Sequence, residues 1–76
     1  MSAFRFMRGD RSGSYSVHRG EQWLGHVVRE VISVTERGVT RSRTNWRPST
    51  IDGVDLASKA TRGAAARALW EYFQRR

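Results

Sequence analysis

A long hydrophobic stretch occupies residues 23–34, and many of its positions hold β-branched side chains. Such side chains are typical of strands, because they fit a pleated surface. A turn signal follows at residues 36–38, and the chain then alternates again over residues 39–47. Gly38 offers the positive φ that a short hairpin loop with a bulge requires. The pattern therefore predicts a long β-hairpin.

Apolar side chains occupy both faces of the first strand of this hairpin. Leu24 and Val28 share one face in the period-2 geometry of a strand. Trp23 and Val27 share the other face. We therefore expect a strand that is covered on both sides or that contains a bulge that switches faces. Gly25 marks a point at which another element approaches the backbone closely.

The segments on either side of the hairpin predict shorter elements. Residues 15–19 alternate and predict a strand. Pro48 cannot donate to a sheet, so the return strand should end near it or lie at an edge. Asp52 and Gly53 form a turn signal between apolar residues. A helix should run from Ser58 or Thr61 to residue 75, with one apolar stripe: Ala65, Ala66, Leu69, Tyr72 and Phe73.

Together these elements predict an α+β fold, a three-stranded antiparallel meander with one C-terminal helix packed on one face. The sheet should span residues 15–50 and the helix residues 58–75, in a single domain of residues 1–76. Residues 1–14 contain an alternating segment that pairs as an edge strand in one interpretation, followed by a polar, glycine-rich loop. A chain of 76 residues buries only about 60% of its unfolded surface, and this one has no cysteine. A partner or a homodimer is one source of extra stability.

The formal net charge of +7 is high for this length. Such a charge favours binding to nucleic acid, to acidic proteins or to an anionic membrane surface. No apolar run approaches the roughly 18 residues that a membrane-spanning helix needs, and no secretory signal is visible. We therefore expect a cytoplasmic protein in a bacterial host cell.

An arginine ladder is the best candidate binding site. In period-2 geometry one face of the return strand carries Arg41, Arg43, Asn45 and Arg47, and the other carries Thr40, Ser42, Thr44 and Trp46. A β-ribbon fits the major groove of DNA, where Arg pairs with guanine and Asn with adenine. Arg19 and Arg29 extend this patch if they share its face, and Trp46 either stacks on the ligand or belongs to the core. The alternative is a solvated edge strand whose charges prevent aggregation.

Catalytic and cofactor-binding patterns do not appear in the sequence. It has no phosphate-binding glycine loop, no Ser/His/Asp arrangement and no nucleophilic cysteine. His18 and His26 lack the further ligands that a zinc site requires. We therefore expect neither an enzyme nor a bound cofactor or metal.

The order of elements resembles two groups of DNA-binding domains, the AP2/ERF type and the N-terminal arm-binding domains of tyrosine integrases. Residues 23–25, residues 46–47, the Asp52-Gly53 turn and residues 61–69 carry the resemblance. The sequence departs from the AP2 pattern because it lacks the N-terminal Arg-Gly-Val-Arg run and has a longer second hairpin. The resemblance implies a sheet that lies in the major groove of DNA, with Arg and Trp side chains in contact with bases and phosphates. The sequence is also similar to small basic proteins encoded by actinobacterial phages.

Two hypotheses about function follow from these patterns. In the first, a small phage or mobile-element protein binds duplex DNA through its arginine-rich sheet face. In the second, a phage-encoded interaction or inhibitor protein docks on an acidic surface of a host protein. The arginine ladder favours the first hypothesis, and the apolar residues on both faces of the long strand favour the second or a homodimer.

Overall fold

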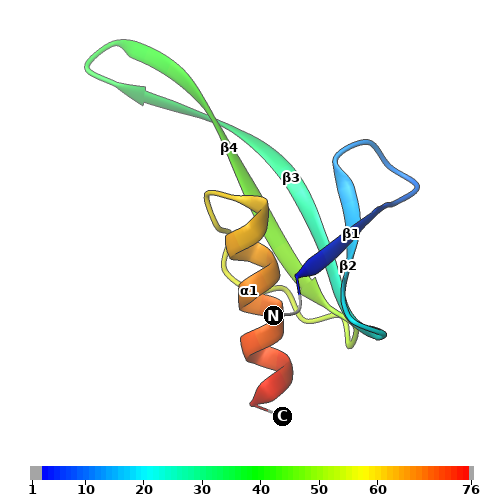
Figure 1. The fold of residues 1–76 in the computed structure, drawn as a ribbon. Coiled ribbons are helices and arrows are strands. Elements are labelled where there is room, and N and C mark those ends of the chain that lie inside the picture. The colour runs from blue at the N-terminus through cyan, green and yellow to red at the C-terminus, as the bar shows by residue number, and fades with distance from the viewer. Residues whose placement is uncertain (1–2, 76) are drawn as a thin grey trace.

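The computed structural model describes residues 3–75 and has an α+β fold. Four antiparallel strands form one sheet in the order β1-β2-β3-β4, and one helix follows them. Figure 1 shows the helix lying across one face of the sheet, while the hairpin of the last two strands projects beyond the other elements. The elements are β1 (Phe4–Arg8), β2 (Ser14–Arg19), β3 (Gln22–Glu36), β4 (Val39–Thr50) and α1 (Arg62–Gln74).

The predicted antiparallel sheet and C-terminal helix are confirmed, but the predicted count of three strands is wrong. The alternating segment near the N-terminus is a full fourth strand, β1, which pairs with β2 from Phe4–Arg19 to Arg8–Tyr15. Phe4 and Phe6 on this strand pack against the core. These two aromatic side chains at the edge of the sheet enlarge the small core. Their burial favours the pairing of this segment as a strand.

The turn between β3 and β4 is tighter than expected. Glu36 pairs with Val39, so only Arg37 and Gly38 connect the two strands. Both residues have positive φ, 52° and 77°. A two-residue turn of this geometry matches the right-handed twist of the flanking strands. The positive φ at Gly38 is confirmed, and the expected bulge in the loop is wrong.

A bulge occurs instead at the base of β3, and it explains the two apolar faces of this strand. Val17 pairs with Gly25 and His18 pairs with Trp23, which leaves Leu24 as an extra residue. Two residues of β3 therefore oppose one of β2. Leu24 is buried together with Val17, so the bulge brings Leu24 onto the covered face and leaves Trp23 on the other.

The core lies between this covered face and α1. Three residues of α1 are buried in it, Ala65, Ala66 and Leu69, against Val17, Leu24 and Val27 of the sheet. Thr61 caps the helix, because its Oγ1 accepts a hydrogen bond of 3.1 Å from the N–H of Ala64. The apolar stripe continues through Trp70 and Phe73. No helix within residues 3–75 is long and apolar enough to cross a membrane.

Pro48 lies inside β4, which is at the edge of the sheet as the proline requires. The chain after the Asp52-Gly53 turn covers this edge. The N–H of Leu56 donates to the carbonyl oxygen of Pro48 at 2.8 Å, and Trp46 and Lys59 exchange two backbone hydrogen bonds. Beyond Trp46, toward the hairpin turn, no described residue pairs with the outer edge of β4.

Replacing Leu69 with alanine should lower the free energy of unfolding by about 2–5 kcal/mol, because it leaves a cavity under α1. Chemical denaturation of wild type and variant measures this difference. Met7→Ala is the control, since Met7 is 49% exposed and should change stability by less than about 0.5 kcal/mol. A loss at Leu69 no larger than that at Met7 would contradict the packing of α1 on the sheet.

Two glycine-to-alanine variants should have opposite effects on stability. Gly25 has a φ of 144°, and an added Cβ would collide with the carbonyl oxygen of Ser49 on β4. Gly25→Ala should therefore destabilise the protein by about 1–3 kcal/mol. Gly63 lies in α1 with open space around it, so Gly63→Ala should stabilise by about 0.5–1 kcal/mol. Thermal unfolding of both variants tests the pair, and equal effects would refute the close approach at Gly25.

Candidate nucleic-acid interface

The arginine ladder lies on the face of the sheet opposite α1, which we call the open face. Val27 pairs with Pro48, and Val27 belongs to the core under α1. Neighbouring residues on each strand point to the opposite side. The open face of β4 therefore carries Arg41, Arg43, Asn45 and Arg47, opposite Val34, Ile32, Glu30 and Val28 of β3 in that order.

The members of the ladder differ in their ion pairing. Arg47 Nε lies 3.2 Å from Glu30 Oε1, so this guanidinium is partly neutralised. Among residues 3–75 no carboxylate lies within ion-pair distance of Arg41 or Arg43. Both side chains are exposed. Their charges are therefore free to meet a negatively charged ligand.

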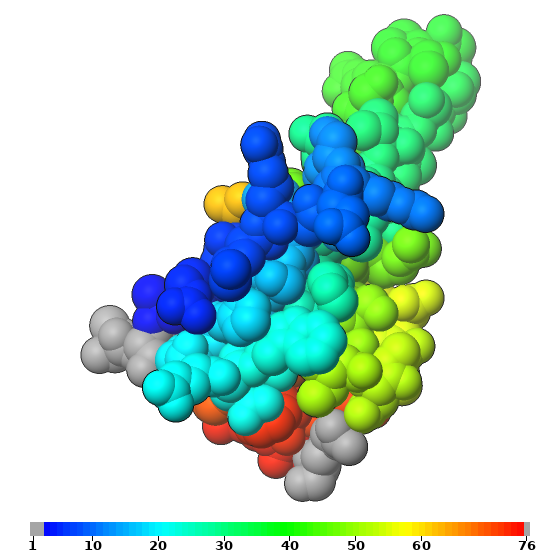
Figure 2. All heavy atoms as spheres, turned by 90° about the vertical axis from the view of Figure 1, so that its right-hand side faces the viewer, coloured from blue at the N-terminus to red at the C-terminus, as the bar shows by residue number. Residues whose placement is uncertain are grey.

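The ladder lies mostly on a two-stranded ribbon, residues 30–45, that extends out of the body of the protein. Pairing of β2 with β3 ends at the Ser14–Val28 pair, and beyond it β3 pairs with β4 alone. Figure 2 shows this ribbon, in green, standing clear of the remaining atoms. Its open face contributes to a hollow of about 540 Å³ near the turn, which Arg37, Arg41 and Arg43 line. A ligand can therefore reach the ribbon from more than one side.

Arg19 and Arg29 do not extend the ladder, which corrects the expectation from the sequence. Both lie on the face that α1 covers, because they pair with Phe4 and Trp46 of that face. The Arg19 guanidinium lies over the Trp70 ring at 4.2 Å from its centroid. It therefore packs against the aromatic part of the core.

Trp46 also lies on the covered face, as the alternation of β4 predicts. Its ring is partly buried against the core and lies 5.9 Å from the Tyr15 ring. The indole is therefore separated from the ladder by the thickness of the sheet. A ligand on the open face does not stack on Trp46 in this arrangement.

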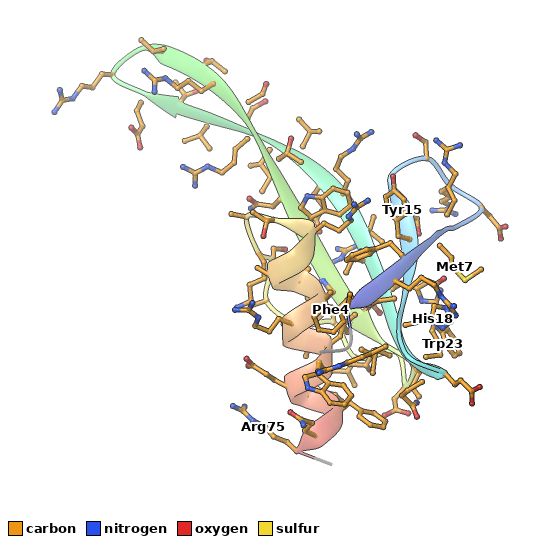
Figure 3. All side chains as sticks on the ribbon, in the orientation of Figure 1. Phe4, Met7, Tyr15, His18, Trp23 and Arg75 are labelled. Atoms are coloured by element: carbon orange, nitrogen blue, oxygen red, sulfur yellow. The ribbon has the colours of Figure 1, made fainter. Side chains whose placement is uncertain are left out.

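The structure adds an aromatic group to the open face that sequence reasoning missed. Trp23 is 42% exposed there, and its indole N–H donates to the carbonyl oxygen of Gly25 at 3.1 Å. The His26 ring stands perpendicular to it, with 5.4 Å between centroids. Figure 3 shows Met7, His18 and Trp23 on the side of the sheet away from α1. Alternation in β1 and β2 would have found Met7 and His18, whereas the bulge decides the side of Trp23.

Within residues 3–75, no three His, Asp or Glu side chains gather as a metal site requires. No protein family model, no curated protein and no solved structure matches this chain. The resemblance to AP2/ERF-type and integrase arm-binding domains stays a prediction that rests on the residues that suggested it. The function is therefore inferred from the geometry and charge of the open face.

Proposed function

We propose that this protein binds duplex DNA through the open face of the β3–β4 ribbon. The observation that carries the proposal is the position of Arg41 and Arg43. They stand on a projecting two-stranded ribbon, on the face that α1 leaves uncovered, without a neutralising carboxylate among residues 3–75. Phosphate contacts by such side chains supply most of the affinity of basic proteins for DNA. The net charge of +7 acts in the same direction at longer range.

Asn45 and Arg47 give the proposed interface a means of reading sequence. A two-stranded ribbon fits the major groove, where Asn forms two hydrogen bonds with adenine and Arg forms two with guanine. Asn45 lies directly opposite Glu30, and Glu30 holds the Nε side of Arg47. Because the ion pair involves Nε, the terminal nitrogens of Arg47 remain available for base contacts. We therefore assign phosphate contacts to Arg41 and Arg43 and base contacts to Asn45 and Arg47.

A second candidate function is docking on an acidic surface of another protein. The exposed apolar side chains of the open face favour it: Trp23 and Met7 near the base and Ile32, 37% exposed, on the ribbon. Aromatic side chains and Met are common in protein interfaces. DNA binding by phosphate contacts would make little use of them. The salt dependence of DNA binding separates the two functions.

Replacing Arg41 and Arg43 together with alanine should weaken DNA binding at every sequence. If four to six phosphates are neutralised, the slope of log K against log salt should be about −4 to −5 for wild type. The double variant should flatten this slope by about two units. Fluorescence anisotropy with labelled duplex DNA at several salt concentrations measures both values.

The matched control replaces Arg67 on α1 and Arg75 at its C-cap with alanine. Both side chains are exposed and lie outside the ladder, and the change in net charge is the same. This control should keep the wild-type slope within about half a unit. Equal losses in the two double variants would mean that only net charge matters. A wild-type protein that binds no DNA at low salt would rule out the proposal in favour of a protein partner.

Glu30→Gln should tighten DNA binding, because it removes a negative charge from the open face and releases Arg47 from its ion pair. One more guanidinium can then neutralise a phosphate, so the salt slope should steepen by about one unit. Glu71→Gln on the exposed side of α1 is the control. If the two variants change affinity equally, Glu30 has no specific influence on the ladder. The same experiment on non-cognate duplexes reports whether freeing Arg47 also reduces sequence discrimination.

A further inference from the structure

A second group of arginines lies near Tyr15 on the covered face of the sheet. Arg8 pairs directly with Tyr15 across β1 and β2. The Arg62 guanidinium, at the start of α1, lies over the Tyr15 ring at 4.9 Å from its centroid. Arg29 lines the same hollow as Arg8 and Tyr15. Arginines from three different elements thus lie near Tyr15: Arg62 stacks on its ring, and Arg8 and Arg29 line the hollow beside it.

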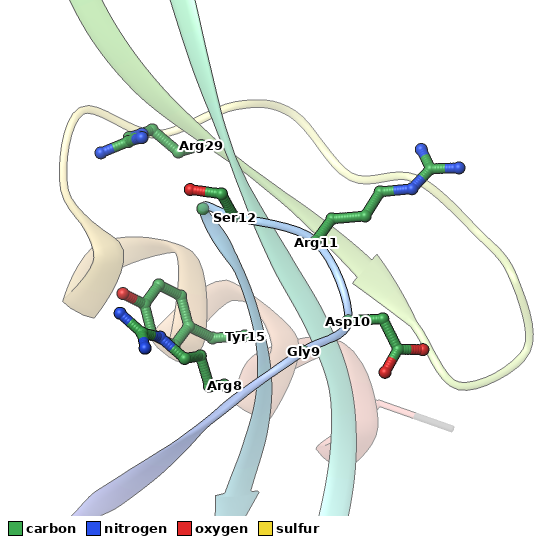
Figure 4. A pocket seen from close by; sticks show the side chains of 8 residues that line it. Arg8, Gly9, Asp10, Arg11, Ser12, Tyr15 and Arg29 are labelled. Carbon is green, nitrogen blue, oxygen red and sulfur yellow. The ribbon is translucent and has the colours of Figure 1, made fainter.

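The hollow beside Tyr15 is open to solvent and has a volume of about 420 Å³. Figure 4 shows Arg8, Tyr15 and Arg29 on one side of the β1–β2 loop, with Asp10 and Arg11 on the other. Among residues 3–75 no carboxylate is within ion-pair distance of Arg8 or Arg29. The side of the hollow next to Tyr15 thus has uncompensated positive charge.

The loop that borders the hollow is fixed by backbone hydrogen bonds. The N–H of Gly9 donates to the carbonyl oxygen of Ser14, and the N–H of Arg29 donates to that of Gly13, both at 2.8 Å. Gly13 has a φ of 81°, and an added Cβ would lie only 3.3 Å from Arg29 Nε. The absence of a side chain here lets Arg29 lie across the loop. A side chain at position 13 would crowd Arg29, so Gly13 leaves the space that this exposed side chain occupies beside the hollow.

We propose that Arg8, Arg29 and Tyr15, with Ser12 from the loop, form an oxyanion site that takes a phosphate group. Guanidinium forks match the geometry of phosphate oxygens, and the Ser and Tyr hydroxyls add donors. Arg62, at the start of α1, adds positive charge beside Tyr15. This site is independent of the proposed DNA interface, because it lies on the opposite face of the sheet. Its phosphate comes either from a free anion or from the backbone of a second nucleic-acid segment.

Titration with inorganic phosphate, followed by amide chemical shifts, tests the site. Saturable shifts are expected at Ser12, Gly13 and Arg29, and sodium chloride at equal ionic strength should not reproduce them. Arg8→Gln and Arg29→Gln should each weaken phosphate binding about tenfold, since each removes a charged hydrogen-bond donor. Arg67→Gln, on the exposed side of α1, should have no effect. Shifts that do not saturate, or equal affinity in all variants, would overturn the proposal.

A second measurement identifies the source of the phosphate and separates this site from the ladder. In the Arg41→Ala/Arg43→Ala background, residual binding of duplex DNA is compared with and without Arg8→Gln and Arg29→Gln. A further loss of at least about tenfold assigns the site to a nucleic-acid backbone. Unchanged residual binding, with phosphate titration intact, assigns it to a free phosphate. Unfolding midpoints close to that of wild type confirm that the glutamine variants are folded. The arginine ladder is already removed in this background, so both outcomes report on the hollow beside Tyr15 and not on the ladder.

Discussion

The pairing of β3 with β4 is the constraint on which the rest of the structure depends. It runs without interruption from Gly25–Thr50 to Glu36–Val39. A shift of one residue would exchange the two faces of one strand. Arg41 and Arg43 would then exchange faces with their neighbours, and Pro48 and Thr50 would leave their buried positions beside α1. The register is fixed at one end by the Arg37-Gly38 turn and at the other by Gly25, where β4 approaches too closely for any side chain.

The core covers only the base of this hairpin. α1 contributes two alanines and one leucine to it, and the aromatic side chains of β1 and β2 enlarge it at the edge. The ribbon of residues 30–45 extends beyond this core, with Val31 68% exposed. An isolated two-stranded hairpin is only marginally stable in water. The ribbon therefore depends on its anchored base and on cross-strand contacts such as Glu30–Arg47 and the 3.0 Å hydrogen bond between the hydroxyls of Thr35 and Thr40.

Arginine serves two physical purposes in this small domain. On the covered face, Arg19 of β2 lies over Trp70 of α1, and Arg62 of α1 lies over Phe6 of β1 at 4.4 Å, so these guanidinium groups pack on partly buried aromatic rings between the helix and the sheet. On the open face, Arg41 and Arg43 touch no ring and no carboxylate among the described residues. Net charge alone does not distinguish these roles. The face of the sheet does, and the proposed interface therefore rests on register more than on composition.

The sequence by itself determined the long hairpin, the positive φ of Gly38 and the sharing of one face by Arg41, Arg43, Asn45 and Arg47. These follow from local rules, the period of two and the backbone freedom of glycine. Only the tertiary structure decided that β1 is a strand, that the bulge at Leu24 leaves Trp23 outside, that Thr61 and not Ser58 caps the helix, and that Arg19 and Arg29 lie on the face opposite the ladder. Those outcomes depend on which face the helix covers and how strands distant in sequence align, because burial is a property of the packed molecule and not of any one segment.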